Sequence, residues 1–206
     1  MTMPCPGVYL DPAADVLLAR HSAPRRALFL DRDGVINIDH GYVHAPDQTV
    51  FVDGIFSLCE AARDEGYVMV VVTNQAGIAR GLYSEPQFVA YTRWLHAEFA
   101  RRGAPLLATY YCPHHPTAGM GEYRLDCDCR KPAPGMLLEA IRDQAIDPAR
   151  SLIIGDKTGD IEAGLAAGIG HCILLGEQQL PVSQHATVMR SSSLSDISRI
   201  FRPPAT

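Results

Sequence analysis

The sequence predicts an α/β protein in which a parallel sheet is covered by helices on both faces, giving three layers. Apolar runs of strand length recur along the chain and alternate with segments whose apolar residues have helical spacing. The run YVMVVVT at Tyr67–Thr73 lacks polar alternation, which indicates a strand buried on both faces. Polar turns containing glycine, DRDG and GDKTGD, each follow one of these runs. Such a sheet binds ligands at the carboxyl ends of its strands.

Residues 1–24 contain several prolines, so we expect an irregular arm with one short helix at Ala13–Arg20. Five short apolar runs bounded by turn residues then predict strands. These runs are Ala27–Asp31, Tyr67–Thr73, Leu106–Tyr111, Ser151–Gly155 and His171–Leu175. A last short strand and a helix are expected within residues 184–201.

Helices are expected between the strands, and their ends carry recognisable signals. Ser84 and Gln87 are spaced as a capping box, and Gly103 is placed to end the helix that they begin. Gly66 and Gly168 are placed to end two others. The predicted helices are Ile55–Glu65, Ser84–Arg102, Gly135–Gln144 and Ile161–Ala167.

Length and composition fit a single globular domain at residues 25–206, preceded by the arm of residues 1–24. The chain has 206 residues, of which 47% are hydrophobic and 20% charged. Its net charge of -5 argues against broad nucleic-acid binding, which needs a basic face. No apolar run approaches the roughly 20 residues of a membrane span, and the start has no signal-peptide pattern. We therefore expect a cytoplasmic protein.

The predicted strand ends carry a set of polar residues that suits phosphoryl chemistry. Asp31 and Asp33 follow the first apolar run, Thr73 ends the second, and Asp156 follows the fourth. Because clustered carboxylates repel one another and an anionic substrate, they favour a bound Mg²⁺, which prefers oxygen ligands. One aspartate could attack phosphorus while the second exchanges protons with the leaving oxygen and water. The threonine hydroxyl and Lys131 could stabilise the phosphoryl oxygens.

A cysteine- and histidine-rich segment at residues 110–132 predicts a structural zinc loop. Cysteines that crowd beside histidines in a reducing compartment favour a metal over disulfides, and these ligand types favour Zn²⁺. Three thiolates and one imidazole would close a four-coordinate shell, although the spacing leaves His114 and His115 as alternatives. The candidate ligands are Cys112, His114 or His115, Cys127 and Cys129. Cys59 and Cys172 fall in apolar patterns and are expected in the core, whereas Cys5 has no evident role.

DRDGV, Thr73, Lys131 and GDKTGD resemble the four motifs of the haloacid-dehalogenase-type phosphatases, so the chain is similar to that family. The resemblance implies a Rossmann-like sheet with a minimal cap and an Asp31 nucleophile that forms an aspartyl-phosphate. Asp33 would be the general acid and base, and Thr73 and Lys131 would stabilise the phosphoryl group. Mg²⁺ would be held by Asp31, Asp156 and the Asp33 main-chain carbonyl. Whether Asp160 ligates or supports the metal stays open.

Further segments resemble the branch of the family whose members remove the C7 phosphate from a heptose 1,7-bisphosphate. These are Asp39–His44, Thr73–Gly81, Tyr110–Pro116 and Cys127–Leu137. The likeness covers roughly residues 27 to 180 and implies zinc ligation by His114 rather than His115. It also implies substrate contacts from Asp39, His40, Gly41, Tyr42, Thr73, Asn74, Gln75, Ala76, Arg130, Lys131 and Lys157. Arg130 suits the second phosphate of such a substrate, because a guanidinium binds phosphate with two parallel hydrogen bonds.

Two alternative functions remain at this point. A histidinol-phosphate phosphatase would share the zinc pattern and the motifs, although GIARG and DHGYVH favour the heptose branch. A nonenzymatic phospho-receiver module stabilised by zinc would also use an aspartate and Mg²⁺, but it needs no acid–base group at Asp33. We expect a monomer, a phosphosugar substrate with the β anomer preferred, and a place in surface-glycan or lipopolysaccharide synthesis. Neither nucleic acid nor a membrane is an expected partner.

Overall fold

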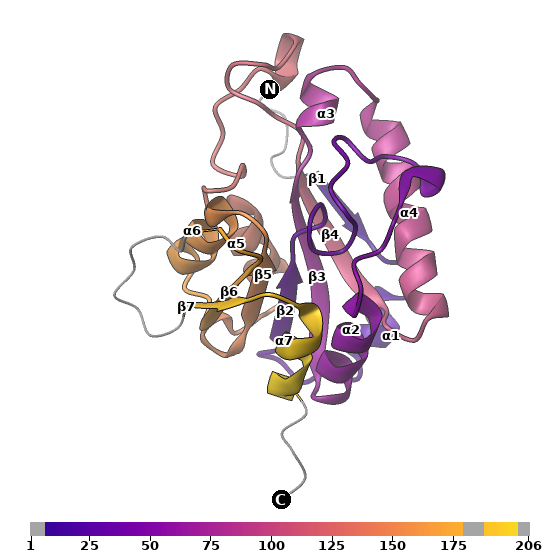
Figure 1. Cartoon of the computed structure of the whole chain (residues 1–206), viewed down its shortest axis with the longest axis vertical. Helices are drawn as coiled ribbons and strands as arrows, with labels where there is room; N and C mark the ends of the chain where they lie inside the picture. The colour runs from indigo at the N-terminus through magenta and orange to yellow at the C-terminus, as the bar shows by residue number, and fades with distance from the viewer. Residues whose placement is uncertain (1–6, 179–187, 202–206) are drawn as a thin grey trace, which may run out of the picture.

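The computed structural model describes residues 7–178 and 188–201, which form one seven-stranded sheet flanked by helices (Figure 1). The strand order is β1-β4-β3-β2-β5-β6-β7. The strands are β1 (Gly7–Leu10), β2 (Arg26–Leu30), β3 (Tyr67–Asn74), β4 (Leu106–Cys112), β5 (Leu152–Gly155), β6 (His171–Leu175) and β7 (Val188–Ser191). The helices are α1 (Ala14–Leu18), α2 (Ile55–Asp64), α3 (Ala76–Ala79), α4 (Glu85–Arg101), α5 (Gly135–Asp143), α6 (Thr158–Ala166) and α7 (Leu194–Phe201).

The strands from β2 to β7 pair in parallel, as the sequence predicts, but β1 pairs antiparallel with the edge of β4. The expectation of an irregular arm was therefore wrong for Gly7–Leu10, which extends the sheet by one strand. Four residues between prolines give little periodicity, and what stabilises the strand is its pairing with Tyr111 and its neighbours. The short helix predicted at Ala13–Arg20 is confirmed as α1. Cys5 and the rest of residues 1–6 lie outside the described ranges.

Two apolar clusters, one on each face of the sheet, confirm the three-layer architecture. One cluster joins the sheet to α1, α5 and α6, and the other joins it to α2, α4 and α7. Cys172 lies in the first and Cys59 in the second, both fully buried, which confirms that they are core residues. No helix in the described part of the chain is long and apolar enough to cross a bilayer.

Local signals explain where two of the helices begin. At α4, Ser84 Oγ accepts a hydrogen bond from Gln87 N and Gln87 Oε1 accepts one from Ser84 N, which confirms the capping box. Helix α6 begins three residues earlier than predicted, because Asp160 Oδ2 accepts from the main-chain nitrogen of Lys157 at 3.0 Å. The motif GDKTGD thus forms a turn and the first turn of a helix.

The order of the central strands determines where a site can form. β2 lies between β3 and β5, and the chain runs outward from it in both directions, so the order reverses at β2. The carboxyl ends of these three strands carry Asp31, Thr73 and Asp156. Between β2 and α2 the described chain forms only loops and a 3-10 turn at Pro46–Gln48, which fits a minimal cap.

Candidate active site

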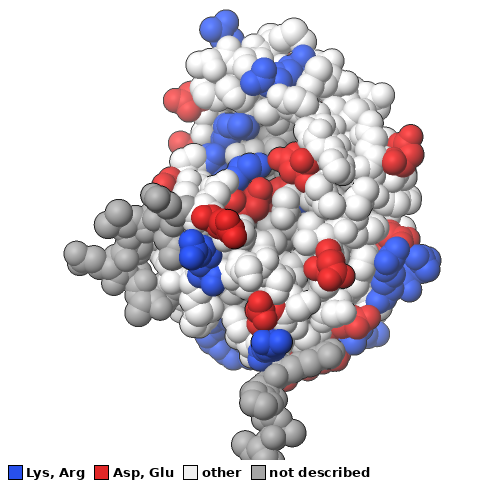
Figure 2. Space-filling view, viewed as in Figure 1, with Lys and Arg blue, Asp and Glu red and all other residues white. Residues whose placement is uncertain are grey.

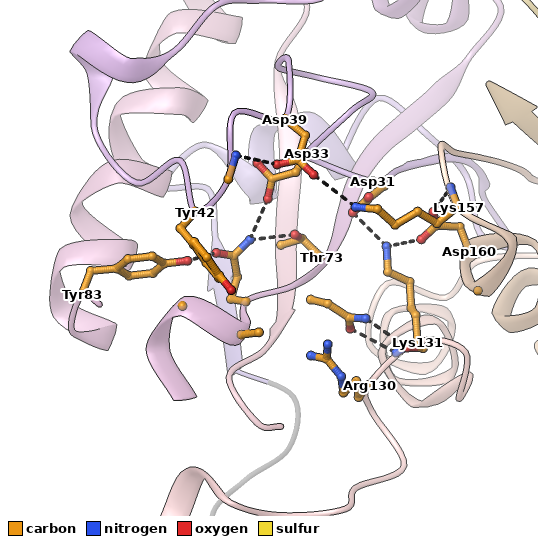
Figure 3. A pocket seen from close by; sticks show the side chains of 16 residues that line it. Asp31, Asp33, Asp39, Tyr42, Thr73, Tyr83, Arg130, Lys131, Lys157 and Asp160 are labelled. Carbon is orange, nitrogen blue, oxygen red and sulfur yellow. Dashed lines mark hydrogen bonds and ion pairs between the residues drawn. The ribbon is translucent and has the colours of Figure 1, made fainter. Parts of the chain in front are cut away.

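Asp31 and Lys131 form a buried ion pair at the end of β2. The Lys131 ammonium lies 2.8 Å from Asp31 Oδ1 and 2.5 Å from Asp160 Oδ1, and it donates to the carbonyl of Val72 at 2.7 Å (Figure 3). Burial raises the pKa of Asp31 to about 7, although the neighbouring ammonium acts in the opposite direction. Burial disfavours the charged lysine, but the two carboxylates outweigh it and raise its pKa. Lys131 is therefore a cation held at the Asp31 carboxylate.

The Asp33 carboxylate is oriented by three side chains. Arg32 Nη2 donates to both of its oxygens, and Asn37 Nδ2 donates to Oδ1 at 3.0 Å. Gln75 Nε2 lies 3.3 Å from Asp33 Oδ2 and also donates to the hydroxyl of Thr73 at 2.8 Å. One amide thus joins the acid at the end of β2 to the hydroxyl at the end of β3.

Three carboxylates form a group that fits a hard divalent cation. Oxygens of Asp31, Asp156 and Asp160 lie within 4.8 Å of one another. Asp156 Oδ1 is buried and has no hydrogen-bond partner among the described residues. An unsatisfied buried carboxylate oxygen is costly, and a cation would satisfy it. Gly34 allows this approach, because a Cβ there would collide with the Asp156 carboxylate, and its φ of +96° favours glycine.

This group consists of side chains only, so it can contain two of the three predicted Mg²⁺ ligands, the third being a main-chain carbonyl. Asp31 and Asp156 are brought together as expected, and Asp160 joins them through its side chain. The Asp33 side chain turns instead towards Arg32, while its main-chain carbonyl was the predicted ligand atom. Asp160 also binds Lys131 and the main-chain nitrogen of Lys157, so its carboxylate has partners without a metal.

A cavity of about 610 Å³ opens beside these groups (Figure 3). It gathers the predicted substrate residues Asp39, Gly41, Tyr42, Thr73, Asn74, Gln75, Ala76, Arg130, Lys131 and Lys157. His40 is exposed and does not line the cavity, although it was predicted to touch the substrate. In Figure 2, basic and acidic side chains lie side by side around a hollow on the upper part of the face shown. The mixture suits an anion that carries hydroxyl groups.

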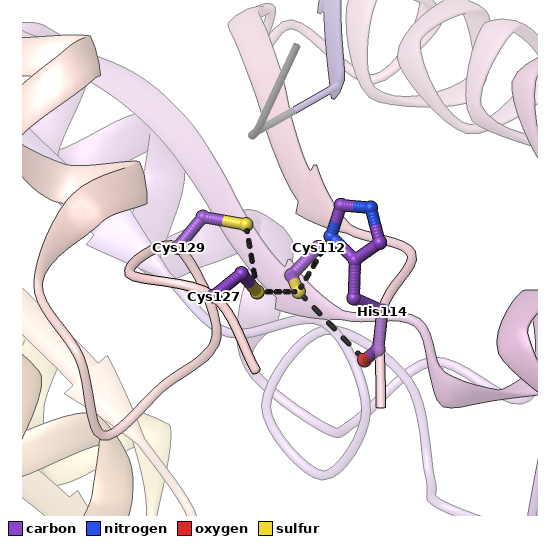
Figure 4. A group of neighbouring side chains, drawn as sticks. All are labelled: Cys112, His114, Cys127 and Cys129. Carbon is purple, nitrogen blue, oxygen red and sulfur yellow. Dashed lines mark hydrogen bonds between the residues drawn. The ribbon is translucent and has the colours of Figure 1, made fainter. Parts of the chain in front are cut away.

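The four predicted zinc ligands meet in one cluster (Figure 4). Cys112 Sγ lies 3.5 Å from Cys127 Sγ and 4.0 Å from His114 Nδ1, and Cys127 Sγ lies 3.5 Å from Cys129 Sγ. Ligands of a tetrahedral zinc with bonds near 2.3 Å are about 3.8 Å apart, so these spacings fit the ion. Cys129 is disulfide-bonded in this structure, and only its reduced thiolate would be a ligand.

Hydrogen bonds join this cluster to the cavity. Arg130 Nη1 donates to the main-chain carbonyl of His114 at 3.1 Å. Lys131 is fastened to the end of β3, because the Asn74 amide exchanges two hydrogen bonds with its main chain, at 3.0 and 3.1 Å. His115 lies outside the cluster, where its Nδ1 accepts from the nitrogens of Thr117 and Ala118. Hydrogen bonds that involve main-chain groups of the loop therefore position Arg130 and Lys131.

Comparison with known proteins places the chain in a family. Residues 128–187 match a family model described as HAD-hydrolase-like. The chain is 53% identical over 151 residues to the D-glycero-beta-D-manno-heptose-1,7-bisphosphate 7-phosphatase of Pasteurella multocida. The aligned region covers 73% of this chain and 82% of that protein. It is 52% identical over 150 residues to the corresponding alpha-heptose enzyme of Burkholderia mallei, covering 73% and 79%. The chain belongs to the heptose-bisphosphate phosphatase family of HAD-like hydrolases. It is a phosphoric monoester hydrolase.

Solved structures agree with this assignment. A protein from Mesorhizobium loti described as a HAD-like phosphatase has a TM-score of 0.82 and 34% identity, covering 98% of this phosphatase and 95% of that chain. The D,D-heptose 1,7-bisphosphate phosphatase of B. bronchiseptica, complexed with magnesium and phosphate, has a TM-score of 0.74 and 28% identity, covering 87% and 99%. The fold predicted from the sequence is thus confirmed.

Three residues of the phosphatase site were not predicted from the sequence. Arg32 lies inside the DRDG motif, but nothing in the motif says that its side chain turns back onto Asp33. Asn37 follows four residues after that aspartate, within a loop. Tyr83 donates its hydroxyl to Gln75 Oε1 at 2.6 Å and lines the cavity. A lone tyrosine before a helix carries no sequence signal for such a role.

Proposed function

We propose that this phosphatase removes the C7 phosphate from D-glycero-D-manno-heptose 1,7-bisphosphate and leaves the C1 phosphate in place. The proposal rests on one observation, which is that two basic side chains line different parts of the same cavity. Lys131 lies at the Asp31 carboxylate, whereas Arg130 lines the same cavity from the zinc loop. A substrate with two phosphates needs both, one for the reacting group and one for the retained group. The names of the similar enzymes support the same substrate.

The roles that we propose for the two aspartates define the reaction. The Asp31 carboxylate attacks phosphorus to form an aspartyl-phosphate, and the C7 oxygen leaves with a proton from Asp33. Asp33 then removes a proton from water, which hydrolyses the intermediate and restores Asp31. Lys131 and the Thr73 hydroxyl hold the phosphoryl oxygens while charge builds up on them.

Asp31, Asp156 and the Asp33 main chain would hold Mg²⁺, with Asp160 supporting them by orienting Lys131. The ion would supply positive charge between the carboxylates and the phosphoryl group. Zn²⁺ would be held by Cys112, His114, Cys127 and Cys129. It would order the loop that carries the two cations and take no part in the chemistry.

The rest of the cavity would bind the sugar and the second phosphate. Lys157 Nζ lies 3.3 Å from Asp39 Oδ2, so this pair can exchange its mutual contact for contacts with hydroxyl groups. Tyr42 lines the cavity and is exposed, with a φ of +56°, so its ring is accessible to a sugar. We place the enzyme in the cytoplasm as a monomer, where its product would enter surface-glycan or lipopolysaccharide synthesis.

The decisive experiment compares phosphate release from the β and α anomers of the heptose bisphosphate with release from histidinol phosphate. We expect kcat/KM to favour a heptose bisphosphate by orders of magnitude, with the β anomer ahead of the α anomer. ³¹P NMR of the product should show that the C1 phosphate is retained. Equal kcat/KM values for the heptose and histidinol substrates would refute the proposal.

Two variants test the assigned roles. Asp31→Asn should abolish turnover, because an amide is no nucleophile towards phosphorus. Arg130→Gln should raise KM for the bisphosphate much more than for a heptose 7-phosphate, which lacks the second phosphate. Arg124→Gln, an exposed arginine of the same loop that does not line the cavity, serves as the matched control.

A further inference from the structure

A second cavity lies at the opposite edge of the sheet, beneath the strands whose other ends carry the active site. Its lining residues come just before or at the start of three adjacent strands, with Arg25 and Arg26 at β2, Gly66 before β3 and Arg150 before β5. Its volume is about 370 Å³, which is within the range of small-ligand pockets. Parallel strands separate this edge from the carboxyl ends, so the cavity is distinct from the active site.

The cavity is strongly basic in a chain of net charge -5. Arg20, Arg25, Arg26 and Arg150 line it, and no acidic residue of the described chain does. None of these four guanidiniums forms an ion pair with a carboxylate in residues 7–178 or 188–201. Four unpaired cations around one cavity repel each other, and an anion among them removes that repulsion.

Two of the guanidiniums are already fixed in place. Arg25 donates from Nε to the carbonyl of His21 at 3.1 Å and from Nη1 to the carbonyl of Gln144 at 3.0 Å. Arg26 donates to the carbonyl of Glu65, and its guanidinium carbon lies 4.7 Å from the centre of the Tyr67 ring. These contacts leave other N–H groups of both arginines without partners among the described residues. The pKa of His21 is lowered by burial and by Arg25 and Arg20, which agrees with a positive potential.

We propose that this cavity binds a compact anion with at least two phosphoryl groups. The planar N–H fork of arginine matches phosphate oxygens in pairs, and fixed guanidiniums lose little entropy on binding. Among the described residues, the imidazole of His21 is the one aromatic ring that lines the cavity, so a nucleobase would find a single small ring to stack on, whereas phosphoryl groups would find four guanidiniums. Pyrophosphate represents this ligand class. The inference is independent of the heptose substrate, because it concerns the other edge of the sheet.

The test measures pyrophosphate binding by isothermal titration calorimetry in magnesium-free buffer at constant ionic strength, with orthophosphate and ATP as further probes. The test variant is Arg20→Gln/Arg150→Gln, which changes two exposed side chains. The matched control is Arg93→Gln/Arg190→Gln, which removes the same charge from exposed arginines that do not line the cavity. The melting temperature of each variant without ligand reports whether it is folded.

We expect the test variant to bind pyrophosphate at least tenfold more weakly than wild type, and the control to stay within twofold. Orthophosphate should bind more weakly than pyrophosphate, and the amide resonance of Gly66 should shift during the titration. Unchanged pyrophosphate affinity in the test variant, or an equal loss in the control, would overturn the proposal. ATP binding tighter than pyrophosphate would overturn the assigned ligand class.

Discussion

Arg32 Nη2 donates hydrogen bonds to both carboxylate oxygens of Asp33, at 2.9 and 2.7 Å. The arginine is only 1% exposed, and its Nη2 also donates to the carbonyl of Val43 at 2.6 Å. Its guanidinium carbon lies 5.2 Å from the ring centre of Tyr91 and 5.5 Å from that of Phe88. A guanidinium with contacts on so many sides has one orientation, and it therefore fixes the orientation of the Asp33 carboxylate.

Replacing this arginine should separate orientation from metal binding. We expect Arg32→Met to lower kcat by about 100-fold, since a misplaced carboxylate loses much of its proton-transfer advantage. The variant should also lower the free energy of unfolding by about 3 kcal/mol, because it leaves the largely buried Asp33 carboxylate without its charged partner. The Mg²⁺ affinity should stay within twofold, since the variant changes neither the Asp31 and Asp156 carboxylates nor the main-chain carbonyl of Asp33.

Steady-state kinetics, urea unfolding and Mg²⁺ titration check these three expectations. Arg32→Lys is the matched variant, because it keeps the charge but loses the planar fork of the guanidinium. Its kcat should lie between those of the wild type and Arg32→Met. A kcat equal to wild type in Arg32→Met would show that Asp33 is oriented without the arginine.

The two carboxylates of the GDKTGD segment should differ in their effect on Mg²⁺. Asp156 Oδ1 has no hydrogen-bond partner in the described residues, whereas Asp160 is bound by Lys131 and the nitrogen of Lys157. We expect Asp160→Asn to raise the dissociation constant for Mg²⁺ by about tenfold, which is typical of a group that supports ligands. Asp156→Asn should raise it beyond about 100-fold. Calorimetric titration checks the order, and a larger effect of Asp160→Asn would make Asp160 the direct ligand.

The sequence was sufficient to predict the central architecture because local patterns specify it. Apolar runs gave β2 to β6 to within about one residue at either end, and Ser84 with Gln87 gave the start of α4. Strand β1 could not be predicted in this way. Its four residues are ordered by pairing with Tyr111 and its neighbours about 100 positions away, and such a contact leaves no local pattern.

The same distinction applies to the candidate site. The rule for parallel strands brings Asp31, Thr73 and Asp156 to one edge without any knowledge of packing. Side-chain directions cannot be predicted by this rule, because they depend on partners that are distant in the sequence. The turn of Asp33 towards Arg32 rests on Tyr91 and its neighbours in α4, more than 50 residues away. For the same reason, the exposure of His40 could not be read from the DHGYVH segment.

Zinc removal should change substrate binding without removing magnesium. Arg130 donates to the main-chain carbonyl of His114, so a loop that loses its metal should misplace the arginine. We expect Cys127→Ser to lose the one zinc expected per chain, raise KM severalfold and lower kcat, with Mg²⁺ affinity unchanged. Elemental analysis, kinetics and Mg²⁺ titration check these expectations.

The matched control for this experiment is Cys172→Ala, which removes a buried core cysteine outside the cluster. It should lower the free energy of unfolding but keep both zinc and KM. A Cys127→Ser enzyme with no zinc and wild-type kinetics would show that the loop positions its cations without the metal.

Protonation of His96 should make stability depend on pH. This side chain connects the N-terminal segment to the core. Its Nδ1 lies 2.9 Å from Asp11 Oδ2, and its Nε2 lies 2.9 Å from Thr109 Oγ1. Burial lowers the pKa of His96 below 6.5, although Asp11 acts against this, so below about pH 6.5 the unfolded chain binds more protons than the folded one. Stability should therefore fall as the pH drops from 6.5 to 5, and His96→Gln should reduce that fall. Urea unfolding at pH 7.5 and pH 5 measures the difference, with exposed His171→Gln as the control. Equal losses in wild type and His96→Gln would show that other groups cause the pH dependence.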